Sequence, residues 1–214
     1  MSAPETSPPR HDFAVVSSDD IYTGKVLAVR RDKVRMPGGG TAVREIMEHA
    51  GAVAIAALDP DDRLVMIYQY RHALSRRLWE MPAGLLDTAG EDPLETARRE
   101  LAEEVGIAAA EWSVLIDVAP SPGFSDESVR VYLATGLTDV GRPDLGADDE
   151  EADLEIHRIP LADAVAMVFD GEIVNSSCAA GVLAVHAVRT GAARTRPAHA
   201  PWPDRPARFA GRKS

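Results

Sequence analysis

The sequence contains a single cysteine among 214 residues, and aromatic residues make up only 5% of the chain. Cys178 therefore has no partner for an internal disulfide, and a lone cysteine fits a reducing compartment. The chain has no apolar run long enough to span a membrane, and its first residues lack the basic and apolar regions of a secretory signal. We expect a cytoplasmic globular protein with no membrane partner.

Positive charge is also scarce, because 23 Lys and Arg residues stand against 34 Asp and Glu residues, a formal net charge of −11. A protein that binds nucleic acid needs a basic surface to meet phosphates, so this balance argues against a nucleic-acid partner. The G-x-x-x-x-G-K-[S/T] loop is absent, and Gly38–Gly40 precedes no helix. A P-loop or dinucleotide-binding fold is therefore unsupported.

The length of the chain allows one good core and a small additional element. Composition and hydrophobic pattern divide it into a disordered N-terminus (1–11), an N-terminal β-sheet element (12–50), a main α/β domain (51–190) and an extended basic tail rich in Pro and Arg (191–214). The sequence leaves open whether the tail is loose or lies along a subunit.

Strands and helices alternate along the main domain. Apolar runs and turn residues predict strands at 21–34, 43–49, 52–58, 63–71, 78–81, 112–118 and 128–137. Three helices are expected, one between Asp92 and Gly106 and the others at 161–169 and 176–189. This order predicts an α/β fold with a mixed sheet between helices.

The first of these helices has clear end signals. Asp92 can serve as N-cap, Pro93 fits the first helical position, and Gly106 is a typical C-terminal stop. The buried stripe is expected to consist of apolar residues spaced three and four apart, namely Leu94, Ala97, Leu101 and Val105.

Three carboxylates, Glu100, Glu103 and Glu104, share one flank of this helix at positions i, i+3 and i+4. Like charges there repel and destabilise the helix. A divalent cation between them would make the arrangement favourable, because hard cations take carboxylate oxygens as ligands. A solvated acidic face is the ordinary explanation of such a cluster. The surrounding residues favour the metal.

From Glu91 to Ile107 the chain resembles the Nudix box, G-x5-E-x7-R-E-U-x-E-E-x-G-U, where U is aliphatic. Every fixed position in that part matches, and the single departure is six residues instead of five between Gly84 and Glu91. The resemblance implies an α/β/α sandwich with a mixed sheet and a small separate N-terminal antiparallel sheet. It also implies a pyrophosphohydrolase that uses Mg²⁺, with Mn²⁺ as an alternative.

Two further stretches, residues 80–84 (Glu-Met-Pro-Ala-Gly) and 121–127 (Ser-Pro-Gly-Phe-Ser-Asp-Glu), are similar to ADP-ribose pyrophosphatases, particularly bacterial ones of the mycobacterial type. That subfamily hydrolyses ADP-ribose to AMP and ribose 5-phosphate and acts as a homodimer. Two alternatives stay open: a pyrophosphatase for another nucleoside diphosphate sugar, and a catalytically silent Nudix domain that binds ADP-ribose as a sensor. The intact carboxylates count against silence.

The chemistry assigns Glu100 and Glu104 as metal ligands with Glu103 assisting, since pyrophosphate hydrolysis needs a cation to offset phosphate charge. The resemblance adds the backbone carbonyl of Ala83 to the metal site. It also implies a general base in the acidic loop 146–153, with Glu151 as first choice and Glu150 as second.

Substrate contacts are expected from five side chains outside the helix. Arg44 and Arg71, at predicted strands, are candidates for contact with phosphate or adenine. Glu80 lies at the end of a predicted strand, just before residues 81–84. Ser125 and Glu127 lie in a Gly/Pro turn and are candidates for contact with the terminal ribose. Arg99 and Glu91 are expected to brace the loop and helix rather than touch substrate.

Overall fold

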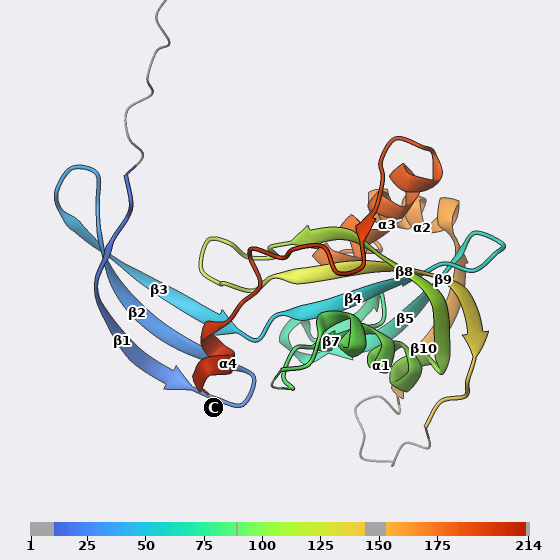
Figure 1. The fold of residues 1–214 in the computed structure, drawn as a ribbon, viewed down its shortest axis with the longest axis horizontal. Helices are drawn as coiled ribbons and strands as arrows, with labels where there is room; N and C mark the ends of the chain where they lie inside the picture. The colour runs from blue at the N-terminus through green and yellow to red at the C-terminus, as the bar shows by residue number, and fades with distance from the viewer. Residues whose placement is uncertain (1–10, 89, 144–152, 213–214) are drawn as a thin grey trace, which may run out of the picture.

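The computed structural model describes residues 11–88, 90–143 and 153–212, and it consists of an N-terminal sheet that projects from a larger α/β body (Figure 1). The strands are β1 (Val15–Thr23), β2 (Leu27–Arg35), β3 (Thr41–His49), β4 (Ala52–Ala57), β5 (Arg63–Arg71), β6 (Arg76–Glu80), β7 (Ala83–Leu85), β8 (Ile107–Val118), β9 (Val129–Asp139), β10 (Glu155–Pro160) and β11 (Arg196–Pro197). The helices are α1 (Pro93–Val105), α2 (Leu161–Phe169), α3 (Ser176–Arg189), α4 (Arg208–Arg212) and the 3₁₀ turn η1 (His72–Leu74).

The N-terminal sheet is antiparallel with strand order β1-β2-β3. The single strand predicted at 21–34 is wrong, because the chain reverses between β1 and β2, where the Gly24 N–H donates to the Leu27 carbonyl at 2.9 Å. The strand predicted at 43–49 lies within β3.

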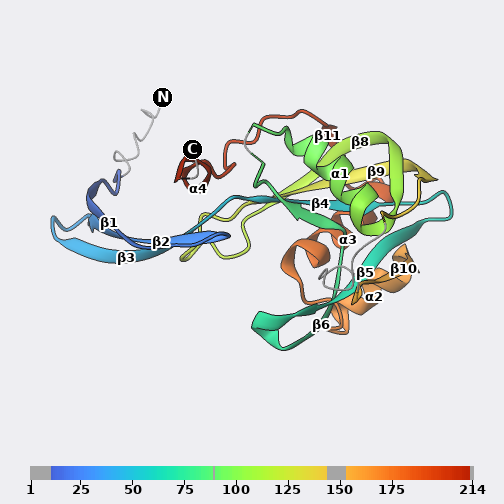
Figure 2. The ribbon, with the colours of Figure 1, turned by 90° about the horizontal axis from the view of Figure 1, so that it is seen from below.

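The body holds a five-stranded sheet, β11-β8-β9-β4-β7, and a three-stranded sheet, β10-β5-β6. The β4–β9 pair is parallel, whereas the β8–β9 and β4–β7 pairs are antiparallel, so the larger sheet is mixed. Helix α1 packs on one face of this sheet and α3 on the other, with α2 beside α3 (Figure 2). The α/β/α sandwich with a separate small N-terminal sheet is confirmed.

The core follows from the alternation of side chains along β4. Val53 and Ile55 face α1 and belong to one apolar cluster, and Ala54 and Ala56 face α2 and α3 and belong to the other. A strand buried on both faces reads as a continuous apolar run, which is why it was readily predicted from sequence.

Other predictions match unevenly. The strand at 63–71 and the helices at 161–169 and 176–189 have the predicted bounds. The strand predicted at 112–118 is longer, because β8 starts at Ile107, directly after Gly106. Of the elements given above, five short ones were not predicted, namely η1, β7, β10, β11 and α4. Of the helices described, none is long and apolar enough to cross a bilayer.

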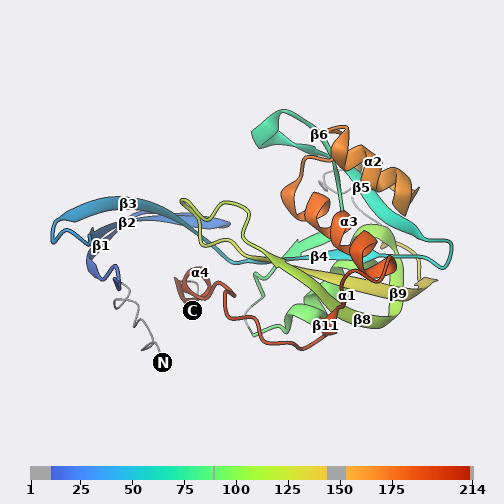
Figure 3. The ribbon, with the colours of Figure 1, turned by 90° about the horizontal axis from the view of Figure 1, so that it is seen from above.

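The C-terminal tail lies along its own chain. Strand β11 pairs with β8 through Val114 and Ser113, and α4 packs on the N-terminal sheet, where Phe209 is buried with Ala28 and Ala50 (Figure 3). The tail therefore joins the body to the sheet.

Candidate active site

Helix α1 places the three acidic residues by ordinary helix rules. The Asp92 carboxylate accepts from the Leu94 N–H at 2.8 Å, and Gly106 closes the helix at a φ of 67°. Leu94 and Leu101 are buried against the sheet, as the spacing predicted. The flank that carries the carboxylates is consequently held at the edge of the core.

Two of these carboxylates converge on strand β7. The Glu104 side chain is buried, and its Oε2 accepts from the Ala83 N–H at 2.9 Å. Glu100 lies against Gly84, because a Cβ built there would be 2.1 Å from the Glu100 carboxyl carbon. Glycine at position 84 is therefore required for the close approach of Glu100 to the loop.

Arg99 forms ion pairs with the carboxylates around this cluster. Its guanidinium lies 2.8 Å from Glu100 Oε1, 2.9 Å from Glu103 Oε2 and 3.2 Å from Glu91 Oε2. Hydrogen bonds from Arg99 and Thr96 hold the pKa of Glu91 below its usual value. This geometry agrees with the bracing role expected for Arg99 and Glu91.

The residues are suited in kind to a hard divalent cation. Glu100 and Glu104 present carboxylate oxygens to the same short stretch of backbone, and such oxygens are what Mg²⁺ takes from proteins. Within the described residues, no three His, Cys, Asp or Glu side chains are already grouped as a metal cage. Arg99 pairs with Glu100 and Glu103, so a cation there would compete with its guanidinium.

Beside β7 lies a pocket of about 500 Å³ whose lining includes Arg71, Glu80, Ala83, Gly84 and Glu127. Arg71 donates to Glu80 through two parallel bonds, of 2.8 and 2.6 Å, so two residues predicted as separate substrate contacts form one ion pair. The Glu80 side chain is only 4% exposed, whereas Arg71 is 47% exposed. The arginine thus covers the carboxylate at the pocket surface.

The pocket contains residues that the sequence interpretation missed as site residues: His49, Asn175, Ser177 and Cys178. The Asn175 side chain caps α3 by accepting from the Cys178 N–H at 3.0 Å. Asn175 before an apolar helix was a readable capping signal, but the sequence does not say that this helix starts at the pocket. Burial raises the pKa of the Cys178 thiol, which makes it a poor nucleophile.

Ser125 and Glu127 differ in position although they share one loop. Ser125 is buried, and its Oγ accepts from the Glu127 N–H at 3.0 Å, a turn-capping bond. Glu127 lines the pocket, 4.0 Å from the His49 ring. The loop is tied to β3, since the Met47 N–H donates to the Phe124 carbonyl at 2.7 Å.

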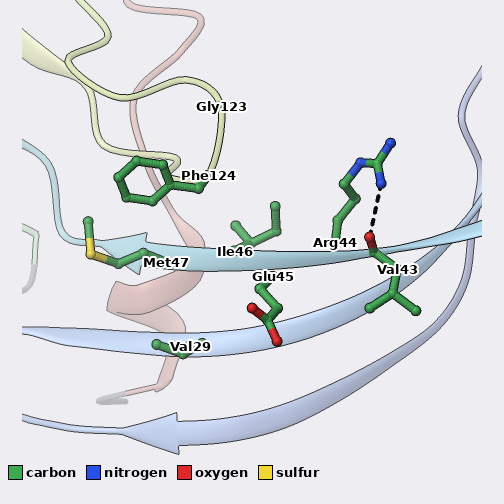
Figure 4. Close-up of a pocket in the computed structure, with 8 residues that line it drawn as sticks. All are labelled: Val29, Val43, Arg44, Glu45, Ile46, Met47, Gly123 and Phe124. Atoms are coloured by element: carbon green, nitrogen blue, oxygen red, sulfur yellow. Dashed lines mark hydrogen bonds between the residues drawn. The ribbon is translucent and has the colours of Figure 1, made fainter.

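Arg44 stands apart from the other candidates. It lines a separate pocket of about 550 Å³ on the N-terminal sheet, together with Phe124 of the loop (Figure 4). Its guanidinium donates to the Val43 carbonyl at 2.9 Å. A single chain does not bring Arg44 into the pocket of Arg71 and Glu80.

Glu150 and Glu151, the predicted bases, lie outside the described residues. The described chain resumes at Asp153, whose carboxylate and carbonyl both accept from Arg77 of β6. The end of the acidic loop is therefore fastened to the three-stranded sheet.

Comparison with protein families gives a match to the NUDIX domain over residues 47–175. The chain belongs to the Nudix family. A second match, to the nucleoside diphosphate sugar hydrolase N-terminal domain, covers residues 14–47, which correspond to the N-terminal sheet. The Nudix match includes helix α1, the loop that contains Ser125 and most of the residues that line the pocket beside β7.

Relatives cover most of the chain. The ADP-ribose pyrophosphatase of Mycobacterium tuberculosis is 59% identical over 204 residues, which are 95% of this chain and 98% of that protein. The ADP-ribose pyrophosphatase of Bacillus subtilis is 35% identical, over 77% of this chain and 87% of that protein. A solved ADP compounds hydrolase shares the fold, with a TM-score of 0.74 at 23% identity over 88% of this chain and all of that one.

Proposed function

We propose that this Nudix pyrophosphohydrolase cleaves the pyrophosphate bond of ADP-ribose, giving AMP and ribose 5-phosphate. The observation that carries the proposal is the meeting of Glu100 and Glu104 with Ala83 and Gly84, beside a pocket of about 500 Å³. Support also comes from the ADP-ribose pyrophosphatase of Mycobacterium tuberculosis, 59% identical over 95% of this chain. A cytoplasmic location belongs to the same proposal.

Nudix hydrolases generally use divalent metals, and we propose Mg²⁺ here, with Mn²⁺ as an alternative. Glu100 and Glu104 would hold the ion with help from Glu103 and the Ala83 carbonyl. When bound, such an ion neutralises pyrophosphate charge and orients a water. Arg99 holds the carboxylates of Glu100 and Glu103 in the metal-free chain, and a bound ion would take over part of these contacts.

The remaining roles fall to residues around the pocket. Glu151, with Glu150 as second choice, would take the proton of the attacking water. Arg71 is exposed enough to reach a phosphate while Glu80 fixes its guanidinium plane. Glu127 would accept from a ribose hydroxyl, and Ser125 would hold the turn that presents it.

We propose that the working unit is a homodimer that shares its substrate sites. Strand β1 is exposed along its whole length, including Val15, Val16, Ile21 and Tyr22, each at least half exposed. A face of this kind on a small sheet favours a partner surface. Packing on a second copy would bring Arg44 toward the partner's pocket, which accounts for its distance from Arg71 in one chain.

A panel of nucleoside diphosphate sugars with Mg²⁺ tests the reaction. ADP-ribose should have the largest kcat/KM and give AMP and ribose 5-phosphate, and EDTA should abolish turnover until Mg²⁺ is returned. A larger kcat/KM for another sugar nucleotide would instead assign that pyrophosphatase activity. Binding of ADP-ribose without turnover would indicate the silent sensor.

Sedimentation at micromolar concentration tests the assembly, because a monomeric mass would exclude the dimer. Mixing an Arg44→Ala chain with a Glu104→Gln chain tests the sharing. If Arg44 acts across the interface, each mixed dimer has one site with both defects and one intact site, so activity should recover. Demonstrated subunit exchange without recovery would place Arg44 in its own chain's site or outside any site.

A further inference from the structure

The C-terminal segment from Arg196 to Arg212 contacts three parts of the molecule that border the candidate active site. In two views it runs from β11 past the start of α1 and ends against the N-terminal sheet (Figures 1 and 3). Neither the Nudix match nor the match to the N-terminal domain extends to this segment.

Its first contact is with the body at Arg130, a buried side chain. The Arg130 guanidinium bonds to Asp117 at 2.8 Å and to the Ala200 carbonyl of the segment at 2.7 Å. The Trp202 ring covers it at 4.7 Å, and the Trp202 N–H donates to Ser128 at 3.1 Å. Ser128 directly follows Glu127, so the segment holds one end of the loop that contains Ser125 and Glu127.

Its second contact is with the residues just before α1 and just before β4. Arg205 donates to the Glu91 carbonyl at 3.3 Å. Pro206 lies so close to Gly51 that a Cβ there would be 3.1 Å from the proline ring. Gly51 belongs to the short connection that joins the N-terminal sheet to the body.

Its third contact is with the N-terminal sheet itself. Phe209 is 1% exposed and packs on Ala28 and Ala50. Arg212 lies 2.5 Å from Glu48 and 2.6 Å from Asp20, while Arg30 reaches Glu48 at 2.6 Å. Glu48 is fully buried, so loss of Arg212 would leave a buried carboxylate with less compensation.

Glu48 lies between Met47 and His49, the two residues of β3 that contact the loop and the pocket beside β7. Met47 bonds to the loop at Phe124, and His49 lines the pocket beside β7. The separate pocket of Arg44 also has walls from both the sheet and this loop. The shape of both pockets therefore depends on the angle between the N-terminal sheet and the body.

We propose that residues 196–212 form a clasp that fixes this angle, and that Phe209 and Arg212 are positioning residues for substrate binding. The substrate half of the proposal rests on the proposed function, because it requires ADP-ribose to span the sheet and the body. The contacts of Phe209 and Arg212 are made at the N-terminal sheet, whereas Glu100, Glu103 and Glu104 lie on α1 of the body. Loosening it should raise KM and leave kcat nearly unchanged.

The test compares the full-length chain with Arg212→Gln and Phe209→Ala. Arg189→Ala is the matched control, because that arginine forms an exposed ion pair with Asp62 away from the clasp. Hydrogen exchange is followed in residues 27–49 and in 107–118, and ADP-ribose kinetics are measured with Mg²⁺. We expect faster exchange in 27–49 only and a KM roughly fivefold higher, with kcat within about twofold of wild type. Arg212→Lys should bring the KM much of the way back to the wild-type value.

Unchanged exchange in 27–49 would overturn the clasp, and faster exchange with an unchanged KM would overturn the positioning role. A fall in kcat with no change in KM would also contradict the positioning role. If Phe209→Ala fails to fold, the milder Arg212→Gln decides. The exchange measurement uses no substrate, so it stands even if wild type fails to hydrolyse ADP-ribose, a result that would refute the proposed function alone.

Discussion

Helix α1 and the C-terminal clasp are both built around arginine–carboxylate pairs, but they differ in how far apart those partners lie in the sequence. In α1, Arg99 pairs with Glu103 four residues away. In the clasp, Arg212 pairs with Glu48, 164 positions away. The local cluster concentrates negative charge beside a pocket, whereas the distant one neutralises a buried carboxylate. The first is suited to chemistry and the second to holding parts together.

This difference in range also sets what the sequence predicts. The capping residues, the buried stripe and the flank of Glu100 and Glu104 follow from 3.6-residue periodicity, and all are observed. Gly84 matters because it contacts Glu100, 16 positions further along the chain. The Nudix motif marks a glycine at this position, but it does not show this contact.

The tail and the pocket required the folded chain. Phe209 and Arg212 sit in a Pro/Arg-rich stretch with no periodicity, so nothing local marks them as buried or paired. Asn175 was readable as a helix cap, but its place in the pocket comes from the packing of α3 on the sheet. The break between β1 and β2 was missed because Gly24 stands between two apolar stretches that read as one strand.

The largest expected effect lies in the acidic loop. Glu151→Gln should lower kcat by about 10²–10⁴, the usual consequence of losing a general base, while metal affinity is nearly retained. Steady-state kinetics with Mg²⁺ titration measure both. If Glu151→Gln is fully active and Glu150→Gln is inactive, the general base is Glu150. If both variants are active, the loop is only a solvated acidic stretch.

Within α1, Glu100→Gln should lower kcat by about two orders of magnitude or more with little loss of folding. Removing the Glu100 charge weakens the cation site, whereas the cost to folding is limited to one part-exposed ion pair with Arg99. Activity at saturating Mg²⁺ and thermal unfolding are the two measurements. Near-normal turnover would contradict the assignment of Glu100 as a ligand.

Gly84→Ala tests the close approach between loop and helix. Its Cβ would collide with the Glu100 carboxyl group, so we expect roughly a tenfold fall in kcat from misplaced geometry. Gly38→Ala is the matched control, because a Cβ there has nothing within 4 Å. Equal activity in the two variants would remove the steric requirement at Gly84.

The smallest effect concerns acid stability of the clasp. Burial alone would raise the pKa of Glu48, but hydrogen bonds from Arg212 and Arg30 outweigh it and leave the pKa below the ordinary 4.5. A lowered folded pKa means that the stabilisation is present above 4.5 and is lost as pH falls through the folded value. The difference in Tm between wild type and Glu48→Gln should therefore shrink as the pH falls below 4.5.

The control for this pH series is Glu45→Gln, since Glu45 is exposed on the same strand and its nearest cation is 3.9 Å away. That variant should follow wild type at every pH. A difference in Tm for Glu48→Gln that stays constant into acid would show that the Glu48 charge contributes no stability to the clasp.

We assign the reaction step to α1 and part of substrate binding to Arg44 of the N-terminal sheet. The most direct test is to measure kcat and KM for ADP-ribose in Glu104→Gln and Arg44→Ala side by side. We predict that Glu104→Gln loses about 10² or more in kcat with little change in KM, because its carboxylate serves the reaction step. Arg44→Ala should raise KM with kcat nearly intact. A large fall in kcat for Arg44→Ala with normal turnover by Glu104→Gln would contradict the account.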